Sequence, residues 1–252
     1  MNEPHRISNR SELLRIYAIA IENQALLLPS KKGMSGCDLF WQHHQGFSLV
    51  VSDVTDDTIS SIDAIREYES VVQLLHDDLD ILPMRYGTVV SASQIPKLLS
   101  ERQEDFQRTL SRVSGCSEML LRWTFPSEEE SSSLAESTEE TSIAKPATGA
   151  DYLKSKFRAA MHRKRHDSLV SDAKEKVETI LGSFVQCSQV KVMDLNNSHS
   201  VSAAVQDQRI LAVDLLVKKA DFVEAFKIAK SIELWGNPPI VARGPLPIYS
   251  FA

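Results

Sequence analysis

Ser117-Glu-Met-Leu-Leu-Arg-Trp-Thr-Phe125 is the stretch that decides how this chain is divided. Its apolar and aromatic run follows Gly115 and predicts a β-strand. Directly after it, residues 127–141 read SEEESSSLAESTEET, with six glutamates and no basic residue. Such a segment buries too little apolar surface to offset the entropy lost on ordering, so we predict a disordered loop there. If this strand belongs with the elements that follow the loop, it opens the second part of the molecule.

Downstream of the acidic loop, the sequence changes to long helical and short strand patterns. The predicted elements are a helical region at 149–185, strands at 189–195 and 210–217, a helix at 221–234 and a strand at 240–242. In the helical region, Leu153, Phe157, Ala160 and Met161 form one apolar stripe and a second begins at Val170, with HRKRHDS at 162–168 between them. One helix or two would fit this pattern.

Upstream of Gly115, strand and helix patterns again alternate. Strands are predicted at 13–21, 38–44, 47–54 and 81–90, and amphipathic helices at 60–79 and 93–113. The pair Gln45-Gly46 between two of the strands predicts a tight turn. Pro96 suits the first turn of the second helix, where no backbone donor is needed.

These patterns predict an α+β fold with two domains. The first, at 1–115, is a separate α+β sheet domain. The second, at 116–243, has the order β-α-β-β-α-β of a ferredoxin-like domain, with the acidic loop at 127–148 and the helical segment at 149–185 as insertions. Residues 244–252 form a tail that is too rich in proline for a helix.

The tail is nevertheless expected to be ordered, because its apolar side chains would be costly to leave in water. They are Leu246, Ile248, Tyr249 and Phe251. We expect the tail to dock in a groove between the two domains. The competing interpretation is that the tail is itself a peptide that binds a partner.

Composition argues against several classes of protein. The net charge of −6 over 252 residues does not favour a nucleic acid or an anionic membrane as partner of the whole molecule. Cys37, Cys116 and Cys187 are widely spaced, which indicates a reducing compartment and neither disulfides nor a zinc ribbon. The N-terminus has no apolar signal core, and no stretch is long enough to span a membrane. We therefore expect a soluble, cytoplasmic protein.

The motifs of common enzymes are missing. Adjacent His43 and His44 would point to opposite faces of a strand and could not share a metal ion. Gly33-Met-Ser-Gly36 lacks the lysine of a phosphate-binding loop, and no G-x-S-x-G occurs. We predict no catalytic residue, no metal or cofactor and no small-molecule substrate, so the chain should not be an enzyme.

Arg85 lies between Met84 and Tyr86 in the predicted strand at 81–90. A buried arginine is rarely left unpaired, so we expect a structural ion pair with a carboxylate of the preceding helix, such as Glu69. The alternative is that Arg85 binds a partner.

Two segments resemble a known family. Leu82-Pro-Met-Arg-Tyr-Gly-Thr-Val-Val90 is similar to the "LP-hydrophobic-R-aromatic-G-T" segment of the gas vesicle F/L proteins (GvpF/GvpL). The stretch 244–251, GPLPIYSF, resembles their "GPWPPYSF" end, with Leu246 and Ile248 in place of the usual tryptophan and proline. GADYL at 149–153 adds a weaker match. The order and spacing agree along the chain except at residues 1–12 and in the acidic loop, and the F proteins are the most similar.

The resemblance implies an accessory or minor structural protein of the gas vesicle, with no catalytic activity. Its implied partners are the small, hydrophobic shell protein of the vesicle wall and other gas vesicle accessory proteins. From the predicted sheet, the segment 189–195 is a candidate edge strand, where Val190 and Val192 would pair with a strand of the shell subunit.

The alternative function is an RNA-binding or regulatory module that uses the basic helix at 154–166. The ferredoxin-like order is also that of RNA-recognition domains, which stack bases on aromatic residues of their central strands. The segments 189–195 and 210–217 contain no aromatic residue, so the sequence favours the gas vesicle over a nucleic-acid partner.

Overall fold

The computed structural model describes residues 12–22, 28, 32–55, 61–124, 149–194 and 209–251. It is a mixed α+β structure with two antiparallel sheets. The chain forms two compact units, here called the first and second unit. The first contains residues 1–118, 218–220 and 245–252, and the second contains 119–217 and 221–244. The predicted acidic loop lies outside the described residues.

The first unit is built on a five-stranded sheet. Its strands are β1 (Leu13–Ile21), β2 (Leu39–His44), β3 (Phe47–Asp53), β4 (Leu82–Pro83) and β5 (Val89–Ser91), in the order β2-β3-β1-β4 with β5 also paired to β1. Gln45 and Gly46 join β2 to β3 with φ angles of 48° and 82°. Positive φ at both positions matches the twist of a two-residue hairpin, so the predicted tight turn is confirmed.

The predicted strand at 81–90 is wrong in its middle, because the chain turns there. Only the short strands β4 and β5 form, and a turn at residues 84–88 separates them. Gly87 has φ of 83°, a conformation that glycine adopts without steric cost. The backbone N–H and the hydroxyl of Thr88 both donate to the carbonyl oxygen of Arg85, at 3.1 and 2.7 Å. Arg85 is therefore a turn residue.

Helices cover both faces of this sheet. The residues of α1 (Ile62–Asp78) pack with Tyr17 and Val50 on one face. On the other face, α2 (Ile95–Glu101) and α3 (Gln103–Val113) pack with Ile16 and Leu49. The predicted single helix at 93–113 is interrupted at Arg102, whose φ of −122° is not helical. Successive side chains of a strand point to opposite faces of the sheet, so the first unit has a separate hydrophobic core on each face.

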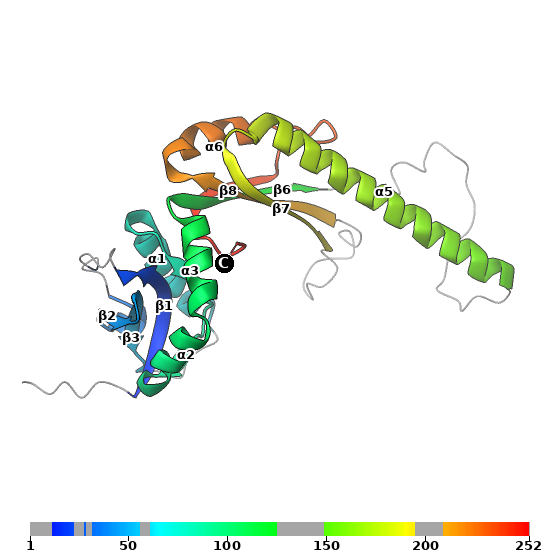
Figure 1. The fold of residues 1–252 in the computed structure, drawn as a ribbon. Coiled ribbons are helices and arrows are strands. Elements are labelled where there is room, and N and C mark those ends of the chain that lie inside the picture. The colour runs from blue at the N-terminus through cyan, green and yellow to red at the C-terminus, as the bar shows by residue number, and fades with distance from the viewer. Residues whose placement is uncertain are drawn as a thin grey trace, which may run out of the picture. The chain divides into compact units, whose positions relative to one another are not determined.

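The second sheet has four antiparallel strands in the order β7-β8-β6-β9. They are β6 (Cys116–Thr124), β7 (Val185–Asp194), β8 (Arg209–Lys218) and β9 (Val241–Leu246). The helices α5 (Gly149–Leu181) and α6 (Phe222–Lys230) lie on one face of this sheet (Figure 1). Along the chain the order is β6-α5-β7-β8-α6-β9.

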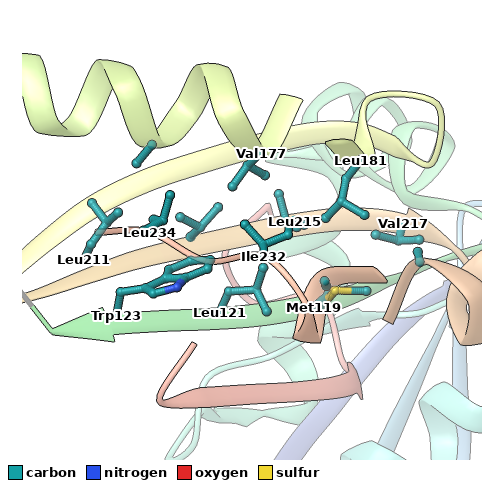
Figure 2. Close-up of a cluster of buried hydrophobic side chains, with 14 of the residues drawn as sticks. Met119, Leu121, Trp123, Val177, Leu181, Leu211, Leu215, Val217, Ile232 and Leu234 are labelled. Atoms are coloured by element: carbon teal, nitrogen blue, oxygen red, sulfur yellow. The ribbon is translucent and has the colours of Figure 1, made fainter. Parts of the chain in front are cut away.

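The core of the second unit fills the space between this sheet and its helices. In Figure 2, Leu121 and Trp123 of β6, Leu215 of β8, and Val177 and Leu181 of α5 lie in one layer. Each of these five side chains is buried. Burial of side chains of this size typically contributes about 1.5–3 kcal/mol each.

α5 is a single helix, and it is longer than the strand beside it. Its 33 residues span about 50 Å, whereas the 10 residues of β7 span about 33 Å. The N-terminal end of α5 consequently reaches past the sheet (Figure 1). The predicted apolar stripe of Leu153, Phe157, Ala160 and Met161 lies on this part, and all four side chains are exposed. None of the described helices is long and apolar enough to cross a membrane.

Candidate partner-binding surfaces

The C-terminal tail is an ordered part of the first unit. The side chains of Ile248 and Phe251 are buried, with 1% and 2% exposure. The guanidinium of Arg112 on α3 donates to the carbonyl oxygen of Phe251. The side-chain amide of Gln73 on α1 lies within 3.4 Å of the carbonyl oxygen of Pro245. The prolines exclude a helix, and apolar burial with side-chain hydrogen bonds fixes the tail instead.

Glu118 is the polar anchor of the tail. It lies near the start of β6 and is only 5% exposed. The backbone N–H and the hydroxyl of Ser250 each donate to one of its carboxylate oxygens, both at 2.8 Å. A buried carboxylate is costly unless it accepts such bonds, and charge-assisted bonds are about twice as strong as neutral ones. The tail and this carboxylate therefore stabilise each other.

Tyr68 of α1 contacts the segment 82–90, and Tyr249 of the tail contributes to its electrostatic surroundings. The Tyr68 hydroxyl donates to the carbonyl oxygen of Met84 at 2.7 Å, and its ring meets the Tyr86 ring edge-on at 5.5 Å. Burial raises the pKa of Tyr68, and Tyr249 of the tail is the next contributor. Burial, with Glu69 second, raises the pKa of Tyr249 to about 12. Segments far apart in sequence thus come together here.

Glu69, Arg85, Tyr86 and Tyr249 border this place, and we refer to them as the motif surface. Glu69 and Arg85 are exposed, and Tyr249 is 41% exposed. The predicted buried ion pair between Arg85 and Glu69 is wrong: both side chains are exposed, and no salt bridge joins them in the described part of the chain. The turn at 84–88 is the physical reason, because it brings Arg85 to the surface where a strand would have buried it.

A second buried polar cluster in the first unit was not predicted. His76 of α1 is 2% exposed, and its Nε2 lies 2.9 Å from the hydroxyl of Ser117. The Lys219 ammonium donates to the carbonyl oxygens of His76 and Leu79, at 2.8 and 3.1 Å, and pairs with Asp80 at 3.4 Å. Members of this cluster are up to 143 residues apart in sequence, so no local pattern could have identified it.

The pKa shifts and the burial of this cluster indicate a structural role. Burial, followed by the nearby Lys219 ammonium, lowers the pKa of His76 to about 4. Burial alone would raise the pKa of Asp80, but bonds from Ser114 and Gly115 together with Lys219 hold it below its usual value. A histidine beside a serine can suggest a nucleophile and its base. Here both side chains are buried, at 2% and 1% exposure, so a substrate has no access to them.

In the second unit, β7 is an edge of the sheet, because in the described residues it pairs only with β8. Val190 and Val192 lie opposite Val213 and Leu211 of β8, and both pack against the core on the helix side. Lys191 alternates with them, and its ammonium lies 3.5 Å from Asp214. The backbone groups on the outer side of β7 can accept a further strand.

The face of this sheet opposite the helices bears charged residues. Arg122 of β6 lies 3.0 Å from the buried Asp214 of β8. Among the central strands β6 and β8 the one aromatic residue is Trp123, which is 1% exposed in the core. These strands therefore offer no aromatic platform for stacking bases. In the described part of the chain, no three or more His, Cys, Asp or Glu side chains are placed to hold a metal ion.

Comparison with known proteins gives one consistent picture. Residues 14–252 match the family model described as gas vesicle synthesis protein GvpL/GvpF. The fold is similar to the crystal structure of gas vesicle protein GvpF from Anabaena sp. PCC7120, with a TM-score of 0.67, 15% identity and 96% of each chain covered. It is also similar to GvpF from Microcystis aeruginosa, with a TM-score of 0.62, 14% identity and coverage of 96% of this chain and 99% of the other. No curated protein sequence matches.

Proposed function

The chain belongs to the GvpL/GvpF family of gas vesicle proteins, and from this premise we propose that it binds the hydrophobic shell subunit and assists vesicle assembly. The observation that supports its place in the gas vesicle system is the family match over residues 14–252. We propose a role in the cytoplasm as an accessory or minor structural part that acts by binding and not by catalysis. The burial of the His76–Ser117 pair fits this role.

We further propose that the second unit is a ferredoxin-like domain with a long first helix. Two observations support this assignment. The elements follow the order β-α-β-β-α-β, and the first and third of these strands lie in the centre of the sheet. In such a sheet the second strand, here β7, is an edge, and this edge is our candidate for the contact with the shell subunit.

Strand addition at β7 would give affinity through backbone hydrogen bonds. β7 has 10 residues, which is long enough for several ladder bonds with an added strand. Its side chains do not obstruct this, because Val190 and Val192 face the core and Lys191 is held toward Asp214. Backbone pairing makes modest demands on the sequence of the partner, which suits an assembly factor.

The test uses proline at two adjacent positions, Lys191→Pro and Val192→Pro. Neighbouring residues of a strand direct their N–H groups to opposite sides. One variant therefore loses a bond to β8, and the other loses only an outward donor. We expect the variant that keeps its melting temperature to bind at least about tenfold more weakly to gas vesicles washed free of this protein, which is about 1.4 kcal/mol. If it binds like the unmodified chain, strand addition at β7 is ruled out.

The motif surface is a second candidate contact for the same partner. Arg85 is exposed in the turn at 84–88, and it forms no salt bridge within the described residues. Its guanidinium is therefore available to pair with a carboxylate of the partner. Arg85→Ala should leave the melting temperature within about 2 °C, because exposed side chains contribute little to stability. Weaker binding to washed vesicles would assign Arg85 to the interface, and a large drop in melting temperature would return it to a structural role.

The tail also has two possible roles, which involve Leu246, Tyr249 and Phe251. The burial of Phe251 supports docking, and the partial exposure of Tyr249 supports a share in the interface. Deletion of residues 245–252 separates the two roles. Docking predicts a loss of stability, whereas a pure binding peptide predicts an intact fold with lost association.

A further inference from the structure

The N-terminal part of α5 carries a cluster of exposed apolar side chains. Tyr152, Leu153, Phe157 and Met161 are exposed by 51%, 68%, 68% and 54%. Leu153, Phe157 and Met161 follow one another at four-residue steps, so they form a stripe about two and a half turns long on one side of the helix. Soluble proteins seldom leave such a continuous stripe in water unless it meets a partner or an interface.

The stripe points away from the sheet of its own unit. Farther along α5, Ala173, Val177 and Leu181 are buried against the sheet. At about 100° per residue, the step from Phe157 to Ala173 turns the side chain by about 160° around the helix. The exposed stripe and the buried one therefore lie on nearly opposite sides of α5, and the end that carries the stripe extends past the strands (Figure 1).

Basic residues surround the stripe. Residues 149–168 include six lysines and arginines but only two aspartates. Lys156 and Lys164 are exposed on the side of the helix that carries the stripe, and the Lys156 ammonium lies 5.6 Å from the centre of the Tyr152 ring. A helix with a narrow apolar side and flanking lysines is typical of helices that lie in a membrane interface. The lysine stems add apolar contact while their charges reach the headgroups.

We propose that residues 152–164 of α5 bind an anionic lipid surface, with the apolar stripe in the acyl boundary and the lysines at the headgroups. The net charge of −6 for the whole chain argues against a membrane, but the charge of this helix end has the opposite sign. Charge argues against a second copy of the stripe as the partner, because two such basic surfaces repel each other. A nucleic acid would use the lysines but has no need of exposed Leu153 and Met161.

The test measures co-sedimentation of the full chain with lipid vesicles. One set contains phosphatidylcholine alone, and in the other about a third of the lipid is phosphatidylserine. We expect binding to the anionic vesicles, weak or no binding to the neutral ones, and loss of binding at high salt. No binding to anionic vesicles, or equal binding to both sets, would overturn the proposal.

Variants assign the binding to the stripe. Leu153→Ser and Phe157→Ser should each weaken vesicle binding by about tenfold, and Lys156→Gln and Lys164→Gln by about fivefold each. Val223→Ser is the matched control, because Val223 is a 70% exposed apolar residue of α6 in the same unit. It should bind normally, and Phe157→Leu should retain most of the binding.

The fold is monitored by circular dichroism and melting temperature, which should not change because Leu153 and Phe157 are exposed. Unchanged vesicle binding by Phe157→Ser would overturn the proposal. So would binding of single-stranded RNA that is unaffected by Phe157→Ser and displaces the chain from vesicles. That outcome would assign the lysines to phosphate recognition alone.

Discussion

His76 illustrates how a single residue links the stability of the first unit to pH. It is a neutral, buried side chain held between Ser117 and the backbone contacts of Lys219. Its Nδ1 has no hydrogen-bond partner in the described structure. A proton added to this ring would place a second cation beside the Lys219 ammonium in a space that water does not reach.

The pKa of His76 gives the direction of this effect. Because the pKa is about 4 in the folded chain against 6.5 for the unperturbed group, the unfolded chain binds more protons between these values. The stabilisation is thus complete above about pH 6.5 and is lost as the pH falls toward 4, by at most about 3 kcal/mol. Chemical denaturation of His76→Gln beside the unmodified chain, at pH 7 and pH 4.5, should show a smaller loss in the variant. Equal losses would mean that His76 does not titrate on unfolding.

Tyr249 and Phe251 are two aromatic residues of the tail with different surroundings. Phe251 is 2% exposed and Tyr249 is 41% exposed. Phe251→Ala should cost about 3 kcal/mol of unfolding free energy, because it leaves a cavity. Tyr249→Ala should cost clearly less. Urea unfolding of both variants measures the difference, and equal costs would show that the tail is not anchored by Phe251.

Local patterns could predict single residues only where the chain itself fixes their surroundings. Gln45-Gly46 was predictable because a two-residue hairpin needs φ above zero at both positions. The position of Arg85 in a turn was not predictable, because its flanking apolar residues are typical of a strand and a single glycine at position 87 does not by itself specify a turn. His76, Ser117 and Lys219 come from three distant segments, and only the tertiary structure brings them together.

At the scale of elements, apolar periodicity indicated which segments form helices or strands, but it did not indicate which of their apolar side chains are buried. It predicted β1 with its observed bounds and the hairpin of β2 and β3. It also placed an apolar stripe at residues 153–161, but periodicity cannot say which side of a helix meets a neighbouring element. The sheet buries Ala173, Val177 and Leu181 of α5, and the stripe lies on nearly the opposite side of the helix, so Leu153 and Phe157 are exposed.

For the whole molecule, the order of the predicted elements placed a domain boundary between residues 115 and 116, but no local pattern indicated the path of the chain. The first unit contains three separate stretches, 1–118, 218–220 and 245–252. The short stretch supplies Lys219 to the buried cluster, and the last one supplies Ile248 and Phe251. The composition of the sequence does not indicate that residues 218–220 and 245–252 belong to the first unit, because this depends on the tertiary structure.

This path predicts that a fragment of residues 1–118 is incomplete. It lacks Lys219 and the tail, so its melting temperature should lie well below that of the full chain. A synthetic peptide of residues 244–252 should raise it, since a ligand at about 100 times its Kd adds about 2.7 kcal/mol. The same peptide with Ile248→Ala and Phe251→Ala is the control. No response to the unmodified peptide would contradict the tail's role in the first unit.

The late arrival of the tail has a consequence for biosynthesis. The residues of β1 to α3 leave the ribosome first, and domains usually fold as they emerge. This unit nevertheless waits for residues 245–251, which are translated after the whole second unit. The first unit therefore starts to fold first but completes its fold last. Until residues 245–251 have been translated, the site that the tail occupies in the folded chain stays empty.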